Sequence, residues 1–174
     1  LDERPEVNIK NLAKAKNKDV NELVICILKR ERHFELIKEC RKIGARIMLI
    51  SDGDVSGVIA TAEEDSGVDM YMGIGGSPEG VLAAAALRCI GGQMQTRLNF
   101  KDEEEINRAR KVGIENLNKV YNLHELAKGD VMFAATGVTD GTMLKGVKNQ
   151  GGFAYTESIV MRSSSQTIRK IKAK

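Results

Sequence analysis

Tryptophan is absent from the 174 residues, and the other aromatic residues amount to 3 tyrosines and 4 phenylalanines. Proteins that bind nucleic acid through a basic surface usually combine clustered lysine and arginine with aromatic side chains. Here the net charge is only +3, and basic residues are interleaved with acidic ones along the chain. We therefore expect no nucleic-acid partner.

The sequence also lacks a hydrophobic run of membrane-spanning length, and its first residues, Leu-Asp-Glu-Arg, are unlike a signal peptide, so we expect no membrane association. Cysteine is scarce too, because Cys26, Cys40 and Cys89 are widely spaced and form no Cys-x-x-Cys pair. Such a set is typical of reduced core thiols in a cytoplasmic protein. Neither His33 nor His124 forms an obvious catalytic pair with a thiol.

The remaining composition is that of an ordinary globular protein, with 42% hydrophobic and 29% charged residues. A length of 174 residues suits one domain with a real core, so we expect a single α/β domain over residues 1–174. The first residue is leucine rather than methionine. We take this as typical of a processed product, an expressed piece or a fragment of something longer.

Apolar runs of strand length alternate with helical patterns in the first half of the chain, after a short amphipathic helix over residues 8–17. The strands are expected at 23–28, 46–50 and 68–74, followed by helices through 36–43, 58–62 and from Pro78 onward. Continuous apolar runs are typical of strands covered on both faces. Three consecutive β-α units predict a parallel sheet wrapped by helices.

The pattern changes after Gly91-Gly92. Strands are expected at 94–100, 131–135 and 151–161, with helices starting at Asp102 and over 123–128, while 166–172 fits a strand or a helix equally. The sequence thus predicts an α/β fold of three layers, αβα, whose middle layer is a mixed, partly parallel sheet.

A glycine-rich octapeptide, Gly73 to Gly80, lies between the third expected strand and an alanine-rich helix. Ser77 suits the N-cap of that helix, Pro78 its first position, and Glu79 the positive end of the helix dipole. Paired glycines before this helix start make a crevice suited to a phosphate. The octapeptide is not a dinucleotide fingerprint, because Pro78 stands where that motif needs glycine, and a second glycine pair, Gly141 and Gly146, is followed by Val147 and is not a Walker A loop. The alternative interpretation is a tight turn with ordinary capping residues.

Unusual polar residues follow each of the three expected strands. Arg30, Arg32 and His33 follow the first, Asp52-Gly53-Asp54 the second, and the octapeptide with Glu79 the third. The carboxyl ends of parallel strands meet at one edge of the sheet, where α/β proteins bind ligands. Guanidinium groups bind phosphate, aspartates accept sugar hydroxyls, and a glutamate suits Mg²⁺ or Mn²⁺. The sequence therefore predicts a site for a phosphorylated polyol and a metal ion.

Each of these residues also has a structural interpretation. Arg30 and Arg32 could pair with Glu31 or Glu35 at the surface, and His33 could be a packing or helix-start residue. The aspartates around Gly53 could form only a turn and a helix cap. A similar segment, Asp140-Gly141-Thr142, is first of all a turn signal.

Together these segments resemble the class II fructose-1,6-bisphosphatases of the GlpX type. The resemblance rests on Arg30-Glu31-Arg32-His33, Asp52-Gly53-Asp54 and the octapeptide, and on Ala134 to Thr139 and Thr156 to Arg162 in the same order. It implies a metal-dependent sugar-bisphosphatase of the lithium-sensitive phosphatase superfamily, in the cytoplasm, acting in gluconeogenesis on the 1-phosphate of fructose 1,6-bisphosphate. Some family members also accept sedoheptulose 1,7-bisphosphate, and both sugars remain candidates.

The resemblance also implies roles for individual residues. Glu79 matches a metal-ligating glutamate, with Mn²⁺ or Mg²⁺ as the cofactor, and Gly76 matches a substrate-contacting glycine. Asp52, Gly53 and Asp54 match the loop that contacts the sugar. Arg30 and Arg32 match the basic pair that holds a substrate phosphate.

One family feature is missing, since neither Pro5 nor Pro78 belongs to the Asp-Pro-x-Asp-Gly-Thr signature of the superfamily. The chain corresponds by resemblance to the C-terminal, substrate-side half of a member. The metal-binding N-terminal half, with the catalytic residues, is expected outside it. We therefore expect the isolated chain to be inactive and to pair with that half or form a homo-oligomer. The alternatives are a non-catalytic sugar-phosphate binding or regulatory domain and a purely structural fragment.

Overall fold

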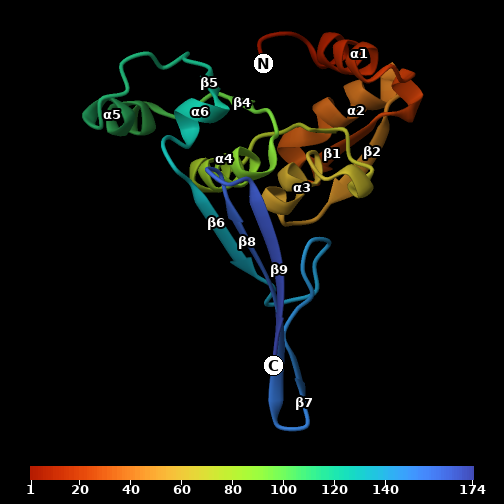
Figure 1. The fold of residues 1–174 in the computed structure, drawn as a ribbon. Helices are drawn as coiled ribbons and strands as arrows, with labels where there is room; N and C mark the ends of the chain where they lie inside the picture. Colours follow the sequence, from red (N-terminus) through yellow and green to blue (C-terminus); the bar gives the residue numbers. More distant parts are fainter.

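The computed structural model describes all residues from 1 to 174, as a body of helices and strands from which a long β-hairpin projects (Figure 1). The helices are α1 (Pro5–Lys16), α2 (Phe34–Ile43), α3 (Asp54–Ala60), α4 (Ser77–Ile90), α5 (Glu103–Lys111) and α6 (Leu123–Leu126). Short 3-10 helices are η1 (Val20–Glu22), η2 (Glu31–His33) and η3 (Glu64–Ser66). The strands are β1 (Val24–Leu28), β2 (Arg46–Ile50), β3 (Met70–Tyr71), β4 (Gln95–Thr96), β5 (Tyr121–Asn122), β6 (Met132–Thr136), β7 (Lys148–Gln150), β8 (Phe153–Arg162) and β9 (Thr167–Ala173).

The first three strands form a parallel sheet in the order β2-β1-β3. Its central strand, β1, is almost wholly buried, as its continuous apolar sequence predicts. Ile25 and Ile27 pack with α1 and α2 in one core cluster. Cys26 points to the other face, toward α3, because neighbouring strand residues alternate between faces. The expected αβα arrangement is therefore present around this sheet.

Helix α4 lies between two layers of the body. Ala86 and Cys89 pack against Phe133, Ile159 and Met161 of the strands β6 and β8. Other residues of the helix share a second cluster with α3 and α6, namely Ala83, Ala84 and Leu87. Small alanine side chains let the helix approach its neighbours closely on several sides. The antiparallel strands beyond α4 thus add a fourth layer.

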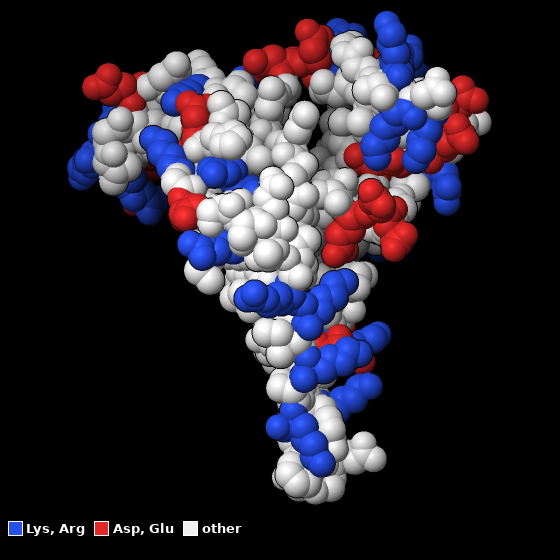
Figure 2. Space-filling view, viewed as in Figure 1, with Lys and Arg blue, Asp and Glu red and all other residues white.

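The long hairpin of β8 and β9 projects from the body and carries β7 along part of its length (Figure 1). Lysine and arginine side chains are spaced along it (Figure 2). Charged residues of this kind protect an exposed strand edge from pairing with other chains. At the projecting end, opposite the turn that joins β8 to β9, the ammonium group of Lys174 lies 4.0 Å from the ring centre of Phe153.

The α/β class and the parallel arrangement of the first three strands are confirmed. The expected single mixed sheet is not found, because the antiparallel strands form two separate sheets, β4-β5 and one built on β8. The third strand is limited to Met70–Tyr71, since only these residues pair in register with β1. The fourth is limited to Gln95–Thr96, β7 was not predicted, and the ambiguous C-terminal segment is a strand.

No helix in the structure has the length and apolar character needed to cross a membrane.

Candidate functional site

The strand order β2-β1-β3 means that the connection from β1 and the connection to β3 run to opposite sides of β1. The chain leaves β1 toward β2 through α2, and returns through α3 to β3 on the other side of β1. In open α/β sheets the loops diverge at such a switch point and leave a crevice at the carboxyl ends of the strands. The segments after β1 and β3 meet here, and together with the segment after β2 they contain the residues singled out in the sequence.

Arg30 joins the ends of β1 and β2. Its guanidinium group donates hydrogen bonds to the backbone oxygens of Lys29, at 2.9 Å, and Ser51, at 2.8 Å. The side chain is exposed and forms no ion pair with a carboxylate. The surface pairing with Glu31 or Glu35 is therefore wrong for Arg30, and its other nitrogens remain available to an anion.

Arg32 joins the end of β1 to the octapeptide. Its Nε donates to the backbone oxygen of Ile74 at 2.9 Å. This leaves the terminal nitrogens of an exposed guanidinium group without a carboxylate partner, because Glu35 pairs instead with Lys38 at 3.7 Å. A guanidinium anchored through Nε presents its two outer nitrogens as a fork, which suits a phosphate.

His33, one residue further on, is only 1% exposed. Its Nδ1 lies 2.7 Å from the backbone oxygen of Leu28, and its Nε2 accepts a hydrogen bond from the backbone N–H of Ile74 at 2.8 Å. Gly73 packs against the ring so closely that a Cβ there would lie 3.1 Å from Cε1. His33 is therefore a structural partner of the octapeptide and does not face solvent.

The segment Asp52 to Asp54 forms a turn that starts α3. Gly53 is the residue before the helix and has a φ of 78°, a left-handed conformation that favours glycine. One oxygen of Asp54 accepts from the N–H of Val55 at 3.0 Å, and the other would lie 3.1 Å from a Cβ at Gly75. The turn is confirmed, but the N-cap of α3 is Gly53 and neither aspartate occupies that position. The same turn brings Asp54 to the octapeptide. Asp52 is exposed beside it.

Tyr71, at the end of β3, is a further member of this group of residues. Burial, and after it the negative charge of Asp54, raises the pKa of Tyr71 to about 12, while Arg32 opposes the shift. The phenol is therefore neutral at physiological pH and can donate or accept a hydrogen bond. A tyrosine on an apolar strand carries no signal of its own, which is why the sequence did not single it out.

The octapeptide leads into α4 as predicted, with a shift of one residue. The helix begins at Ser77 and its N-cap is Gly76, so Ser77 is not the capping residue, and no side chain caps this end. The carboxylate of Glu79 folds back over Gly76, where a Cβ would collide with its Oε2. A side chain at this position would have to displace the Glu79 carboxylate.

The structure brings no three His, Cys, Asp or Glu side chains together as a complete metal site. Glu79 is an exposed carboxylate at a helix N-terminus, which is oxygen chemistry that Mg²⁺ or Mn²⁺ accepts. It supplies one ligand, whereas such ions take about six. The chemistry of Glu79 therefore suits one ligand of such an ion, and the described residues do not form a complete site.

The Asp140-Gly141-Thr142 segment is a turn, as its sequence indicates. Asp140 accepts a hydrogen bond from the N–H of Gly146 at 2.9 Å, and this bond lowers the pKa of the Asp140 carboxyl. Asp140 therefore has a local structural role, which explains why an aspartate occurs in this turn.

Fold and site define an α/β protein whose guanidinium and carboxylate groups gather at the carboxyl edge of a parallel sheet. The family model for bacterial fructose-1,6-bisphosphatase, glpX-encoded, matches residues 1–174. The chain therefore belongs to this family.

The names of curated relatives agree with this family. A protein of a Synechococcus strain named D-fructose 1,6-bisphosphatase class 2/sedoheptulose 1,7-bisphosphatase is 42% identical over 97% of this chain and 52% of its own length. A Synechocystis protein of the same name is 42% identical over 97% of this chain and 53% of its own length. One from Acaryochloris marina is 42% identical over 93% of this chain and 50% of its own length. The chain thus spans about half the length of these relatives.

Proposed function

We propose that this chain is the substrate-side, C-terminal half of a fructose 1,6-bisphosphate 1-phosphatase, a phosphoric monoester hydrolase of gluconeogenesis. The observation that carries this proposal is the meeting of three strand-end segments at one edge of the parallel sheet. Arg30 reaches the end of β2, and Arg32 reaches the octapeptide after β3. Family membership over all residues supports the reaction, and the names of the relatives leave sedoheptulose 1,7-bisphosphate as a second substrate.

Arg30 and Arg32 would bind the phosphate that does not react. Both guanidinium groups are anchored through the backbone at 2.8 to 2.9 Å and are thus held in place before substrate arrives. A preorganised fork loses little conformational entropy on binding an anion. The two side chains would therefore orient the sugar bisphosphate by one of its ends.

Asp52 and Asp54 would accept hydrogen bonds from sugar hydroxyls, while Gly53 and Gly76 would let the substrate approach the backbone. Asp54 is the better positioned carboxylate, because its second oxygen faces the octapeptide at Gly75. Carboxylates that point toward a bound polyol each offer several acceptor sites.

Glu79 would hold one divalent ion, Mn²⁺ or Mg²⁺, which when bound would neutralise charge on the reacting phosphate and activate water. The helix start places this carboxylate directly over Gly76, the glycine proposed to contact substrate. Glu79 would thus connect the substrate crevice with the metal ligands that lie outside these residues.

We further propose that a second half of the complete protein, carrying the remaining metal ligands, covers the surface around Glu79. Three apolar side chains near it are exposed, namely Ile74 at 45%, Val81 at 45% and Leu82 at 51%. Large apolar groups beside a functional carboxylate are typical of an interface. In this proposal residues 1–174 form one α/β domain of the sugar-phosphatase fold, and a homo-oligomer is the alternative arrangement.

The cytoplasm is the proposed compartment, because all three cysteines are free and buried.

The test is phosphate release by the full-length protein with Mn²⁺ or Mg²⁺. We expect Glu79→Gln to reduce turnover by about a hundred-fold or more, with an unchanged unfolding midpoint, since losing a metal ligand removes the charge that the reaction needs. Glu104→Gln, on the exposed first turn of α5, is the matched control and should behave as wild type. Near-normal turnover by Glu79→Gln would contradict the proposed role.

The second candidate is a non-catalytic sugar-phosphate binding or regulatory domain. It is favoured by the lack of a complete metal-ligand cluster within these residues. Calorimetry with fructose 1,6-bisphosphate, with and without Mn²⁺, distinguishes the two functions. Binding without turnover by the full-length protein would support the second candidate, and turnover by residues 1–174 alone would contradict the half-site proposal.

A further inference from the structure

The backbone of Ile74 is held at both of its polar groups by consecutive residues of η2. Its N–H donates to Nε2 of His33 at 2.8 Å, and its oxygen accepts from Nε of Arg32 at 2.9 Å. Ile74 lies two residues before Gly76, the N-cap of α4. A segment right after β1 therefore fixes the position of the octapeptide that follows β3.

The hydrogen bonds of His33 determine which ring nitrogen carries the proton. The N–H of Ile74 is a donor, so Nε2 must be an acceptor and carry no hydrogen. The proton of the neutral ring then lies on Nδ1 and is donated to the backbone oxygen of Leu28 at 2.7 Å. Both partners require this one tautomer, and no buried side-chain polar atom in the structure is left unsatisfied.

The ring is also enclosed on the side of the octapeptide. Gly73 lies against it, and a Cβ at that position would be 3.1 Å from Cε1 and 3.2 Å from Nε2. The ring is 1% exposed, so water cannot easily replace either partner. An unmade hydrogen bond at Ile74 would leave a backbone N–H without a partner.

We propose that His33, as the neutral tautomer protonated on Nδ1, is a positioning residue that sets the octapeptide for catalysis by holding the Ile74 N–H. It touches neither substrate nor metal, and acts through the backbone on Gly76 and Glu79. The inference rests on the proposed function for its effect on catalysis, but the hydrogen bond itself can be tested without any activity.

Two amide variants separate the two hydrogen bonds of the ring. The carboxamide of His33→Gln can reach the position of Nε2 and accept from Ile74, whereas that of His33→Asn reaches only the position of Nδ1 and the oxygen of Leu28. In the full-length protein we expect kcat to fall at least about ten-fold in His33→Asn and clearly less in His33→Gln. A residue that acts only in packing would give equal losses in both variants. That outcome, or near-normal kcat in His33→Asn, would overturn the proposal.

Gly73→Ala tests the same contact from the other side. The added methyl group meets the ring, and the φ of 152° at this glycine is uncommon for other residues. We expect Gly73→Ala and His33→Asn to reduce kcat by similar factors, and the double variant to lose little more than either single one. Losses that multiply in the double variant would show two separate effects and contradict the proposal.

Nuclear magnetic resonance of the protein tests the hydrogen bond directly. We expect the ring ¹⁵N signals of His33 to be those of an Nδ1-protonated imidazole, and the Ile74 amide to exchange slowly in wild type and His33→Gln but faster in His33→Asn. The chain has two histidines, so the ring signals that remain in His124→Gln, which lacks the exposed His124, belong to His33. An Nε2-protonated ring would overturn this inference even in an active phosphatase. The expected tautomer in a protein without phosphatase activity would instead contradict the proposed function.

Discussion

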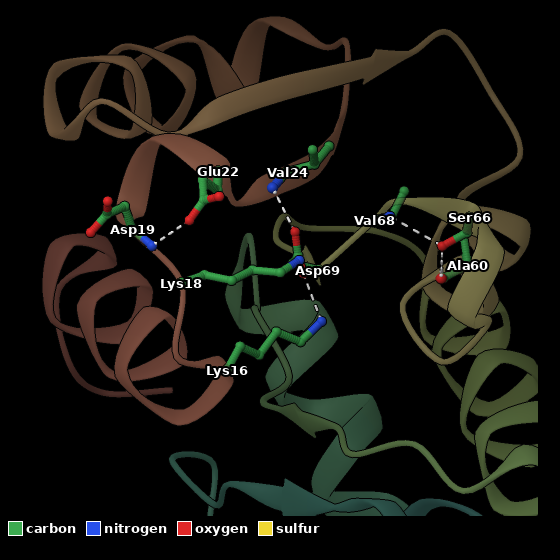
Figure 3. Close-up of polar contacts among 9 residues, drawn as sticks. All are labelled: Lys16, Lys18, Asp19, Glu22, Val24, Ala60, Ser66, Val68 and Asp69. Carbon is green, nitrogen blue, oxygen red and sulfur yellow. Dashed lines mark hydrogen bonds and ion pairs between the residues drawn. The ribbon is translucent and has the colours of Figure 1, made fainter.

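The carboxylate of Asp69 accepts a hydrogen bond from the backbone N–H of Val24 at 2.9 Å, at the amino-end edge of the parallel sheet, opposite the candidate site. The same carboxylate binds the ammonium groups of Lys16 at 2.7 Å and Lys18 at 3.1 Å (Figure 3). Its side chain is only 4% exposed. Asp69 thus ties the end of α1 and the starts of β1 and β3 together.

Removing this charge should destabilise the fold. We expect Asp69→Asn to lower the free energy of unfolding by about 2 kcal/mol, the range for a hydrogen bond to a charged group. The loss stays moderate because Lys16 and Lys18 are partly exposed, at 38% and 43%, and can be hydrated instead. Urea unfolding measures it, with Asp65→Asn on the exposed η3 as the matched control. Equal stability of the two variants would refute the structural role of Asp69.

The same carboxylate predicts a pH dependence. Burial alone would raise the pKa of Asp69, but the hydrogen bonds from Lys16, the Val24 N–H and Lys18 outweigh it and hold the pKa below its usual value of 3.8. A lowered pKa contributes stability that is present above the unfolded value and is lost as the pH falls through the folded value. The difference between wild type and Asp69→Asn should therefore shrink below about pH 4. A difference that stays constant to pH 2 would contradict this assignment.

Replacing two helical glycines by alanine, one at a time, should change the stability of the protein in opposite directions. At Gly57 a Cβ would lie 2.9 Å from Cδ1 of Ile50 and 3.2 Å from Sγ of Cys26, whereas at Gly80 it would meet nothing within 4 Å. We expect Gly57→Ala to destabilise the protein by about 1–2 kcal/mol, because overpacking outweighs the helix preference. Gly80→Ala should stabilise it by up to about 1 kcal/mol. Thermal unfolding of the pair measures the contrast, and two shifts of the same sign would refute it.

The parts of the fold that sequence could predict are those specified by local patterns. The run around Ile25 and Ile27 is continuously apolar, so β1 was expected to be buried, and Gly44 with its φ of 95° ends α2 as expected. The co-location of the strand-end residues followed from parallel direction alone.

What sequence could not predict depends on contacts between distant segments. The role proposed for His33 rests on a hydrogen bond to Ile74, 41 residues away, and the sequence around a buried histidine is the same whether the side chain only packs or also positions a loop. The separation of the sheets follows from the way α4 packs between layers, through Ala86 and Cys89. Neither the hydrogen bond nor the packing of α4 produces a periodic pattern in the sequence.

Arg32 should affect substrate binding more than turnover. Its fork would hold the phosphate that does not react, so we expect Arg32→Ala to raise KM about ten-fold or more in the full-length protein. A smaller fall in kcat is expected from the lost bond to the Ile74 oxygen. Steady-state kinetics separates the two constants, with Arg41→Ala on the exposed last turn of α2 as the control. An unchanged KM would rule out the anchor.

The three thiols should be unreactive in the folded protein. Cys26, Cys40 and Cys89 are free and buried, and burial raises the pKa of each. Because the thiolate is the reactive form, we expect slow modification by a thiol reagent in buffer and fast modification of all three in denaturant. Phosphatase activity should survive brief exposure to the reagent. Rapid loss of activity at pH 7 would instead indicate a functional thiol.

Leu82 can reveal whether a second half covers the surface beside Glu79. In residues 1–174 this side chain is 51% exposed, so Leu82→Ala should change their stability by less than about 0.5 kcal/mol. In the full-length protein the same substitution should cost about 2 kcal/mol or more, because a covered leucine then leaves a cavity. Val112→Ala, at a position 76% exposed after α5, should remain neutral in both proteins. A neutral Leu82→Ala in the full-length protein would mean that the second half does not cover this side chain, and the remaining metal ligands would have to reach Glu79 without covering it.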